Sequence, residues 1–446
     1  MKLKRIIGIC MLLMITITSL SSCFDSTKSA YDIAVENGFN GSASDWLESL
    51  KGQDLDINDI YAAALENGYT GDFLTFLSEF LSFDSGKLLD ATKPDAVNIS
   101  YSLLSSVSIA CTFRYQVDNW GFSTTKEATQ LGSGVIYTID RERGDAYIIT
   151  NYHVVYYYAS TTSNRISDDI SVFLYGMENE ISAIDATYVG GSMQYDIAVL
   201  KIEGSEILKN SDAKAITPSG SHKVAVGTTA IAIGNAAGLG ISVTQGIVSV
   251  DSEEITMTAP DNTSLITHRL LRVDTAVNEG NSGGGLFSAD GKLIGIVNAK
   301  ITSSSVENIA YAIPANVAVS VAQNIIDNCD AKDNTSLLKC QLGVSVLTVN
   351  SSAYFDPITQ STYIKESVII SGVVRNTMAS GILKVGDIIT KIEHNGRSLT
   401  VDRDFVIKDA MIDIRLGDSF TLTVIRDDSE MTFTFVADAD SIIPVS

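Results

Sequence analysis

Residues 278–286 read Asn-Glu-Gly-Asn-Ser-Gly-Gly-Gly-Leu, and this stretch decides how the rest of the sequence is interpreted. Glycines on both sides of Ser282 allow a tight turn, because glycine adopts backbone conformations that other residues avoid. Such a turn can direct the backbone N–H groups of Gly280 and Ser282 toward one point. The stretch therefore predicts a nucleophilic serine beside two donors for an oxyanion.

Two further short stretches supply the partners that such a serine requires. A hydroxyl is a poor nucleophile at neutral pH, so it needs a nearby base and a carboxylate that orients the base. His153 lies in Thr150-Asn151-Tyr152-His153-Val154, and Asp196 opens the apolar run Asp196-Ile197-Ala198-Val199-Leu200, which would bury its carboxylate. We therefore predict that His153, Asp196 and Ser282, in this order, are the catalytic residues.

Short β-branched runs separated by Gly, Asn and Asp predict a mainly β domain after residue 96. The clearest strands are expected at 132–137, 146–149, 170–173, 196–202, 230–233, 246–250 and 293–297. Their spacing suits two antiparallel barrels. Apolar residues at helical spacing predict a helix over 316–328 that closes the domain.

The motifs between residues 132 and 314 resemble, in order, those of HtrA/Deg-type serine proteases: TNYHV, YDIAVL, AIGNAAG, VTQGIVS, NEGNSGGGL, LIGIVNAK and AYAIP. The resemblance implies the trypsin-like double six-stranded β-barrel, which we expect over residues 97–328. It also implies a catalytic triad of His153, Asp196 and Ser282, with the oxyanion hole formed by the N–H groups of Gly280 and Ser282. A homotrimer is a further implication of the resemblance.

The sequence departs from the family pattern at Glu279 and Gly285, where the family usually has proline. The substitutions predict a more flexible loop. The Glu279 carboxylate could favour protonation of His153, repel acidic substrates or point to solvent, and these options stay open. The polar stretch 156–169 is expected to be a surface loop, with a place beside the cleft as a second option.

Residues near the nucleophile limit the expected substrates. Trypsin-like cleavage after Lys or Arg needs an acidic residue six positions before the serine, and Ala276 stands there. Val297, Asn298 and Ala299 are expected to form the pocket wall. We therefore predict a small or medium apolar residue before the scissile bond.

Residues 340–446 resemble the PDZ domain that follows the protease domain in this family. Gln341-Leu342-Gly343-Val344 matches its carboxylate-binding loop, and Gly381-Ile382-Leu383-Lys384-Val385-Gly386-Asp387-Ile388-Ile389 matches its glycine-aspartate segment. The resemblance implies that Leu342, Gly343 and Val344 bind a peptide C-terminus, with the peptide added to a sheet edge. The alternative is a PDZ-like domain that only packs on the protease.

The first residues predict export. Lys2, Lys4 and Arg5 precede an apolar run of about 15 residues, shorter than the ~20 that a membrane-spanning helix needs. Small residues before Cys23 resemble a bacterial lipobox, which implies that Cys23 is lipidated after removal of a signal peptide over 1–22. Ordinary cleavage near Cys23 is the alternative. We expect an extracytoplasmic protein that is lipid-anchored to the bacterial cell envelope.

A short repeat follows the signal peptide. Tyr31–Gly41 matches Tyr61–Gly71, and each copy predicts a short helix that ends at a glycine. We expect a small helical repeat module over 23–83, acting as a spacer or a docking module. Linkers are expected over 84–96 and 329–339.

Composition excludes several classes of partner. The 446 residues carry a net charge of −22, which becomes −25 without the leader's three basic residues, so nucleic acid and anionic membrane surfaces are not expected to bind. Four histidines without an HExxH motif predict no metal site, and we expect no cofactor. Pairing of Cys329 with Cys340 stays open.

Together these observations predict a secreted serine endopeptidase that acts on unfolded or damaged envelope proteins. The substrate class is an implication of the family resemblance. The alternative is a non-proteolytic, PDZ-based peptide-binding or chaperone-like envelope protein.

Overall fold

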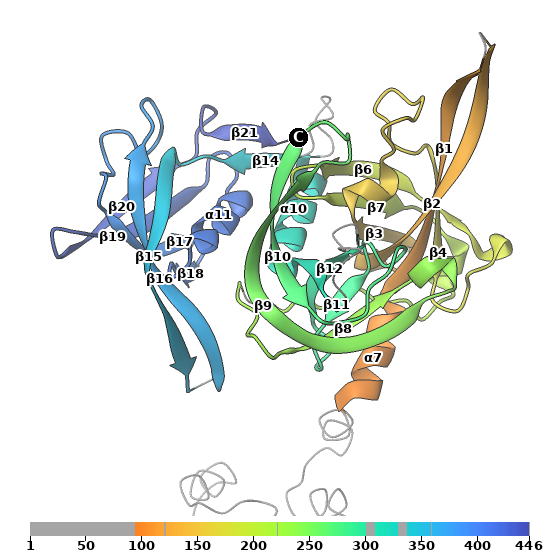
Figure 1. Ribbon diagram of the computed structural model, residues 1–446, viewed down its shortest axis with the longest axis horizontal. Coiled ribbons are helices and arrows are strands. Elements are labelled where there is room, and N and C mark those ends of the chain that lie inside the picture. The colour runs from red at the N-terminus through yellow and green to blue at the C-terminus, as the bar shows by residue number, and fades with distance from the viewer. Residues whose placement is uncertain are drawn as a thin grey trace, which may run out of the picture. The chain divides into compact units, whose positions relative to one another are not determined.

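The computed structural model describes residues 94–119, 122–220, 222–299, 308–328, 337–357 and 359–445 (Figure 1). The expected signal peptide, Cys23, the repeat module and Cys329 lie outside these ranges, as does most of both expected linkers. From Asn98 onward the chain forms one compact unit. No helix in the described ranges is both long and apolar enough to cross a membrane.

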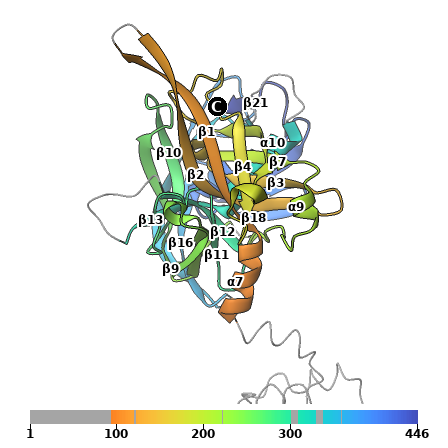
Figure 2. The same ribbon diagram turned by 90° about the vertical axis from the view of Figure 1, so that its right-hand side faces the viewer.

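The first sheet is antiparallel and has the strand order β5-β4-β1-β2-β3-β7-β6. Its strands are β1 (Ser106–Asn119), β2 (Phe122–Asp140), β3 (Asp145–Thr150), β4 (Asp169–Leu174), β5 (Ile184–Asp185), β6 (Thr187–Ser192) and β7 (Ile197–Ile202). Strand β7 is buried at five of its six positions because its apolar run lies in the centre of the domain. The hairpin of β1 and β2 continues beyond the sheet, as Figures 1 and 2 both show.

This first sheet contains seven strands in the described ranges, whereas the resemblance predicted six. The difference arises in the segment 184–192, which is divided at Ala186 into β5 and β6. The Ala186 N–H donates to Ile170 O at 3.0 Å, and Ala186 itself belongs to neither strand. As a result β5 pairs with β4 and β6 pairs with β7, at opposite ends of the strand order.

The second sheet is a closed barrel with the order β10-β13-β12-β11-β8-β9. Its strands are β8 (Thr229–Gly234), β9 (Ser242–Thr258), β10 (Leu265–Val273), β11 (Gly285–Phe287), β12 (Leu293–Asn298) and β13 (Ala310–Pro314). Each strand expected from the sequence overlaps an observed strand, although Asp196 itself precedes β7. The barrel places the loop around Ser282 between β10 and β11.

Short helices precede or connect the strands of the described chain. They are α7 (Pro94–Leu104), α8 (Tyr152–Val155), the 3-10 turns η1 (Glu180–Ser182) and η2 (Ala236–Gly238), and α9 (Glu206–Lys209). Helix α7 begins inside the expected linker, at a proline, which suits the first turn of a helix. Helix α10 (Ala315–Asn328) agrees with the predicted helix and buries Val317, Val321 and Ile325 in the core.

The C-terminal part of this unit is a β domain whose fold is consistent with a PDZ domain. Its sheet has the order β15-β16-β17-β19-β20, with β18 paired to β17, and a second small sheet pairs β14 with β21. These strands are β14 (Leu337–Cys340), β15 (Val344–Asp356), β16 (Ser361–Val373), β17 (Ile388–His394), β18 (Arg397–Thr400), β19 (Ser419–Arg426), β20 (Ser429–Val436) and β21 (Ile442–Val445). Helix α11 (Asp404–Asp413) contributes Phe405 and Met411 to the domain's own apolar core.

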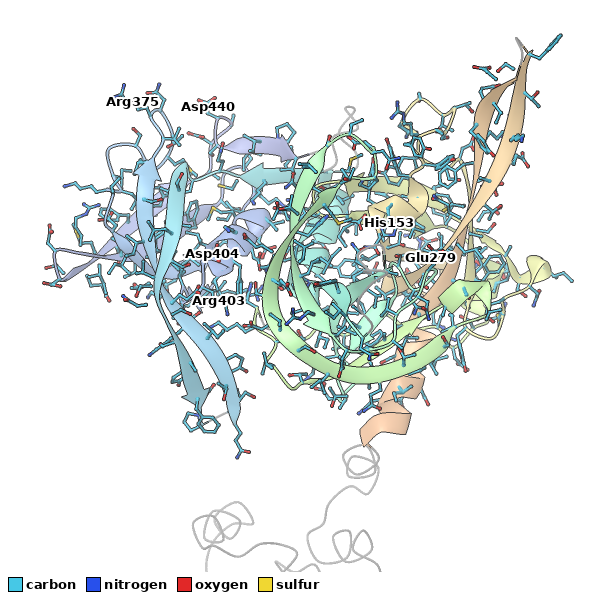
Figure 3. All side chains as sticks on the ribbon, viewed as in Figure 1. His153, Glu279, Arg375, Arg403, Asp404 and Asp440 are labelled. Atoms are coloured by element: carbon cyan, nitrogen blue, oxygen red, sulfur yellow. The ribbon has the colours of Figure 1, made fainter. Side chains whose placement is uncertain are left out.

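Helix α11 is also joined to the second barrel by buried ion pairs. Arg403, directly before α11, donates to Asp251 of β9 at 2.8 Å, and Arg269 of β10 donates to Asp409 of α11 at 2.5 Å. Arg403 and Asp404 are labelled in Figure 3. Because both pairs are largely buried, separating the domains would leave desolvated charges without partners.

A buried ion pair inside the C-terminal domain leads to a stability prediction. Asp387 is 1 % exposed and accepts two hydrogen bonds from Arg426, at 2.7 and 2.6 Å, and one from Lys384 N at 2.8 Å. Burial opposes ionisation, but Arg426 and the backbone donor outweigh it and hold the pKa of Asp387 below its ordinary value. We expect Asp387→Asn to lower the free energy of unfolding of this domain by about 3 kcal/mol, measured by urea denaturation at pH 7.

The same prediction has a pH dependence. Since the folded-state pKa of Asp387 is lowered, its contribution is fully present above the ordinary aspartate pKa of about 3.9 and is lost as the pH falls through the folded value. The stability gap between wild type and Asp387→Asn should therefore narrow in strong acid. Asp428→Asn, at an exposed position, is the matched control. Equal losses of unfolding free energy in Asp387→Asn and Asp428→Asn would contradict the prediction.

Candidate active site

His153 and Asp196 are brought into contact by two loops of the first sheet. His153 lies in α8, directly after β3, and its Nδ1 is 2.8 Å from Asp196 Oδ2 (His153 is labelled in Figure 3). The His153 backbone N–H also donates to Asp196 Oδ1 at 3.0 Å. Asn151 supports the same loop, because its Nδ2 donates to the Asp196 carbonyl at 2.9 Å. The imidazole is therefore held with Nδ1 toward the carboxylate, so Nε2 lies on the side of the ring away from it.

The Asp196 carboxylate is buried but well supplied with donors. It is 3 % exposed, and its backbone has a φ of +50°, a left-handed conformation that is uncommon outside glycine. Burial opposes ionisation, yet the charge and hydrogen bonds of His153, together with the charge of His268, hold the pKa of Asp196 below its ordinary value. Asp196 is therefore ionised and able to stabilise a protonated imidazole.

Asn298 gives the carboxylate a third donor, which sequence reasoning did not identify. Its Nδ2 donates to Asp196 Oδ2 at 2.8 Å, and the residue is 1 % exposed. The sequence predicts Asn298 only as part of the substrate-pocket wall. No local motif marks the bond, since Asn298 and Asp196 are 102 residues apart and meet only where the two sheets face each other.

Ser282 occupies the loop between β10 and β11 and is 6 % exposed. Its Oγ accepts a hydrogen bond from Ala299 N at 3.2 Å. Because Ser282 Oγ acts as the acceptor in this bond, its own proton remains available for a base. The bond also places Ala299, one of the predicted pocket residues, beside the nucleophile.

The backbone around Ser282 requires glycine at two positions. Gly280 has a φ of +94°, and a Cβ there would lie 2.2 Å from Asn235 O. Gly283 has a φ of +85°, and a Cβ there would lie 2.2 Å from Ser133 O. These requirements explain the glycine pattern that identified the loop in the sequence.

The Gly280 N–H has a defined direction. The Glu279 carbonyl accepts a hydrogen bond from Ala237 N at 2.7 Å, and in a planar trans peptide the following N–H points the opposite way. Among the described residues, neither the Gly280 N–H nor the Ser282 N–H donates to another protein group. Both N–H groups are thus free to bind an oxyanion.

Val297 and Ala276, which the sequence assigns to the substrate pocket, differ in exposure. Val297 is buried at the end of β12, where its N–H donates to Gly284 O at 2.8 Å. Ala276 is exposed, and its carbonyl accepts a hydrogen bond from Thr244 at 2.7 Å. Glu279 is exposed and is labelled in Figure 3. The stretch 156–169 folds back on itself, with Tyr156 bridged to Ile166.

In the C-terminal domain the predicted peptide-binding residues lie together at the start of β15. Leu342 is buried, Gly343 has a φ of +85°, and Val344 begins the strand. A Cβ at Gly343 would lie 2.1 Å from Thr377 Oγ1, which explains the glycine. Strand β15 is the terminal strand of its sheet, so one edge can accept a further strand. The other predicted site residue, Cys23, lies outside the described residues.

Known proteins share this sequence pattern. A family model described as a trypsin-like peptidase domain matches residues 132–296. The chain is 31% identical over 371 residues to the serine protease Do-like HtrA of Lactococcus lactis subsp. lactis (strain IL1403), covering 75% of this chain and 82% of that protein. It is 29% identical over 369 residues to the serine protease Do-like HtrA of Bacillus subtilis (strain 168), covering 79% of this chain and 73% of that protein. The solved structure of the HtrA-type protease AlgW with decapeptide is 25% identical, with a TM-score of 0.48 over 78% of this chain and 98% of that chain.

Proposed function

The chain belongs to the HtrA family of trypsin-like serine proteases, and we propose that it cleaves unfolded or damaged proteins outside the cytoplasm. The observation that carries the catalytic part of the proposal is the bond of 2.8 Å between His153 and the buried Asp196. Unfolded chains are proposed as substrates because a protease cleft binds extended segments, and folded proteins seldom offer them.

The proposed mechanism assigns to His153, Asp196 and Ser282 the roles that the family resemblance implies, and the bond between His153 and Asp196 supports it. Ser282 Oγ attacks the scissile carbonyl carbon while His153 Nε2 takes its proton, and Asp196 stabilises the imidazolium. The Gly280 and Ser282 N–H groups stabilise the oxyanion of the tetrahedral intermediate. His153 then returns the proton to the leaving amine, and water releases the acyl group from Ser282 by the same steps.

The substrate proposal predicts where the enzyme cuts. We expect cleavage of reduced, alkylated lactalbumin after small or medium apolar residues, because Ala276 provides no carboxylate to pair with Lys or Arg. Cut sites would be mapped by mass spectrometry, with native lactalbumin as the folded control. Cleavage mainly after Lys or Arg would contradict the pocket assignment, and equal rates on the native protein would contradict the preference for unfolded substrates.

For the C-terminal domain we propose binding of peptide C-termini at Leu342, Gly343 and Val344, with the peptide added to the free edge of β15. The free carboxylate is the recognised group. In the cleavage assay, a peptide with a free C-terminus should change the rate, whereas the same peptide with an amidated C-terminus should not. Equal effects of the two peptides would argue against carboxylate recognition.

We further propose that Cys23 is lipidated and anchors the protein to the envelope. The apolar run before Cys23 and the small residues beside it support this proposal. We expect Cys23→Ser to move the protein from the membrane fraction to the soluble extracytoplasmic fraction. An unchanged distribution would show that the anchor lies elsewhere.

A further inference from the structure

Ser133 of β2 lies in the first sheet but bonds to the nucleophile loop of the second barrel. It is 0 % exposed, and its Oγ donates to Gly280 O at 2.7 Å, across 147 positions of sequence. Its backbone N–H donates to Ser282 O at 2.8 Å. One residue thus holds the carbonyl groups of both predicted oxyanion donors.

The Ser133 hydroxyl has no freedom to rotate. It donates its single proton to Gly280 O and accepts a hydrogen bond from Asn235 N at 2.8 Å. Its backbone carbonyl is held as well, because Thr150 Oγ1 donates to it at 2.7 Å. A serine hydroxyl has one donor, so any other rotamer would leave the buried Gly280 carbonyl without this partner.

These bonds determine the conformation of Gly280 from both sides. The peptide before Gly280 is held by the bond from Ala237 N to the Glu279 carbonyl, at 2.7 Å. The peptide after Gly280 is held by Ser133 at its carbonyl and by Asn278, whose carbonyl accepts from Asn281 N at 3.0 Å. Asn235, the second partner of the hydroxyl, directly precedes the turn η2 that contains Ala237. The Ser133 hydroxyl therefore links the two supports that direct the Gly280 N–H.

We propose that Ser133 is a positioning residue that keeps the Gly280 N–H directed at the oxyanion. The inference rests on the assignment of Gly280 as an oxyanion donor made above. According to this proposal, stabilisation of the tetrahedral intermediate depends on a side chain of the first sheet. Without the hydroxyl, Asn235 N loses its acceptor, and the turn whose Ala237 N–H holds the Glu279 carbonyl is less constrained. The Gly280 N–H, which lies in the same peptide plane as that carbonyl, then loses its direction before the substrate binds.

The test uses Ser133→Ala in the full chain. We expect kcat to fall about 100-fold, as for the loss of one oxyanion donor, with KM changed less than twofold. A peptide boronate forms a tetrahedral adduct on Ser282 whose oxygen occupies the oxyanion site, so its Ki should rise by the same factor as kcat falls. Binding of an uncleaved substrate peptide, measured in the Ser282→Ala background, should not change.

Ser108→Ala is the matched control. Ser108 pairs with Ser133 across β1 and β2 and is also buried, but its Oγ has no hydrogen-bond partner. We expect its kcat and boronate Ki to stay within twofold of wild type. Ser133→Cys has the same side-chain shape but is slightly larger and a weaker donor, so it should give an intermediate kcat. This variant is used if the alanine variant does not fold.

Three results would overturn the proposal. They are a Ser133→Ala enzyme with kcat within threefold of wild type, an equal fall in Ser108→Ala, and an equal weakening of boronate and uncleaved peptide. The last pattern would indicate a general loss of structure. These three results differ from a failure of the proposed proteolytic function. In that case the wild-type protein itself would show no measurable kcat.

Discussion

Ser282→Ala is expected to lower kcat for peptide hydrolysis by about 10⁶-fold, with little change in substrate binding. The variant removes the only atom that forms the acyl bond, while the Gly280 and Ser282 N–H groups remain in place. A residual rate above that in water should persist, because these donors and the binding cleft still act. The measurement is single-turnover cleavage of a peptide, combined with labelling by a fluorophosphonate probe.

The control for this variant is Ser288→Ala. Ser288 lies six residues after the nucleophile and is partly exposed, and its hydroxyl bonds only within its own turn. We expect it to retain full turnover and full probe labelling. Labelling of the Ser282→Ala protein at another residue, or turnover that survives the substitution, would contradict the assignment of the nucleophile. The second outcome would favour the peptide-binding or chaperone-like alternative.

Asp196→Asn is expected to lower kcat by about 10⁴-fold at neutral pH. The carboxylate accepts hydrogen bonds from the His153 backbone, from His153 Nδ1 and from Asn298 Nδ2. An amide has a single oxygen and must present its NH₂ group to one of these donors. If the NH₂ group faces the imidazole, Nδ1 becomes the acceptor and Nε2 carries the proton, so His153 cannot take a proton from Ser282.

The pH dependence of this pair has a defined sign. The pKa of Asp196 is lowered in the folded protein, so its carboxylate stabilises the fold above the ordinary aspartate pKa and loses this effect as the pH falls through the folded value. Protonation of Asp196 therefore does not limit activity above pH ~4. Asp185→Asn, an exposed carboxylate of β5, is the control. A neutral-pH kcat within tenfold of wild type for Asp196→Asn would contradict the orienting role.

Much of the fold could be predicted because its signals are local. Alternating and β-branched runs located the strands, and helical spacing located α10 almost to the residue. The division of one strand at Ala186 was not predictable, because it depends on the bond to Ile170 in a neighbouring strand. The sequence predicts a linker where α7 starts, at Pro94, because the polar composition of 84–96 gives no helical period.

The sequence by itself determined the residue types that the chemistry needs. Gly280 and Gly283 report backbone conformations that other residues avoid, and these requirements are visible in a window of a few residues. The apolar run after Asp196 likewise predicted the burial of its carboxylate.

Only the tertiary structure decided which distant groups support the predicted catalytic residues. Asn298 reaches Asp196 across 102 positions, and Ser133 reaches Gly280 across 147. Neither residue carries a local mark of its role, because the geometry of a hydrogen bond depends on where folding places both partners. The site is formed where the two sheets meet, so its supporting contacts exist only after both sheets have folded.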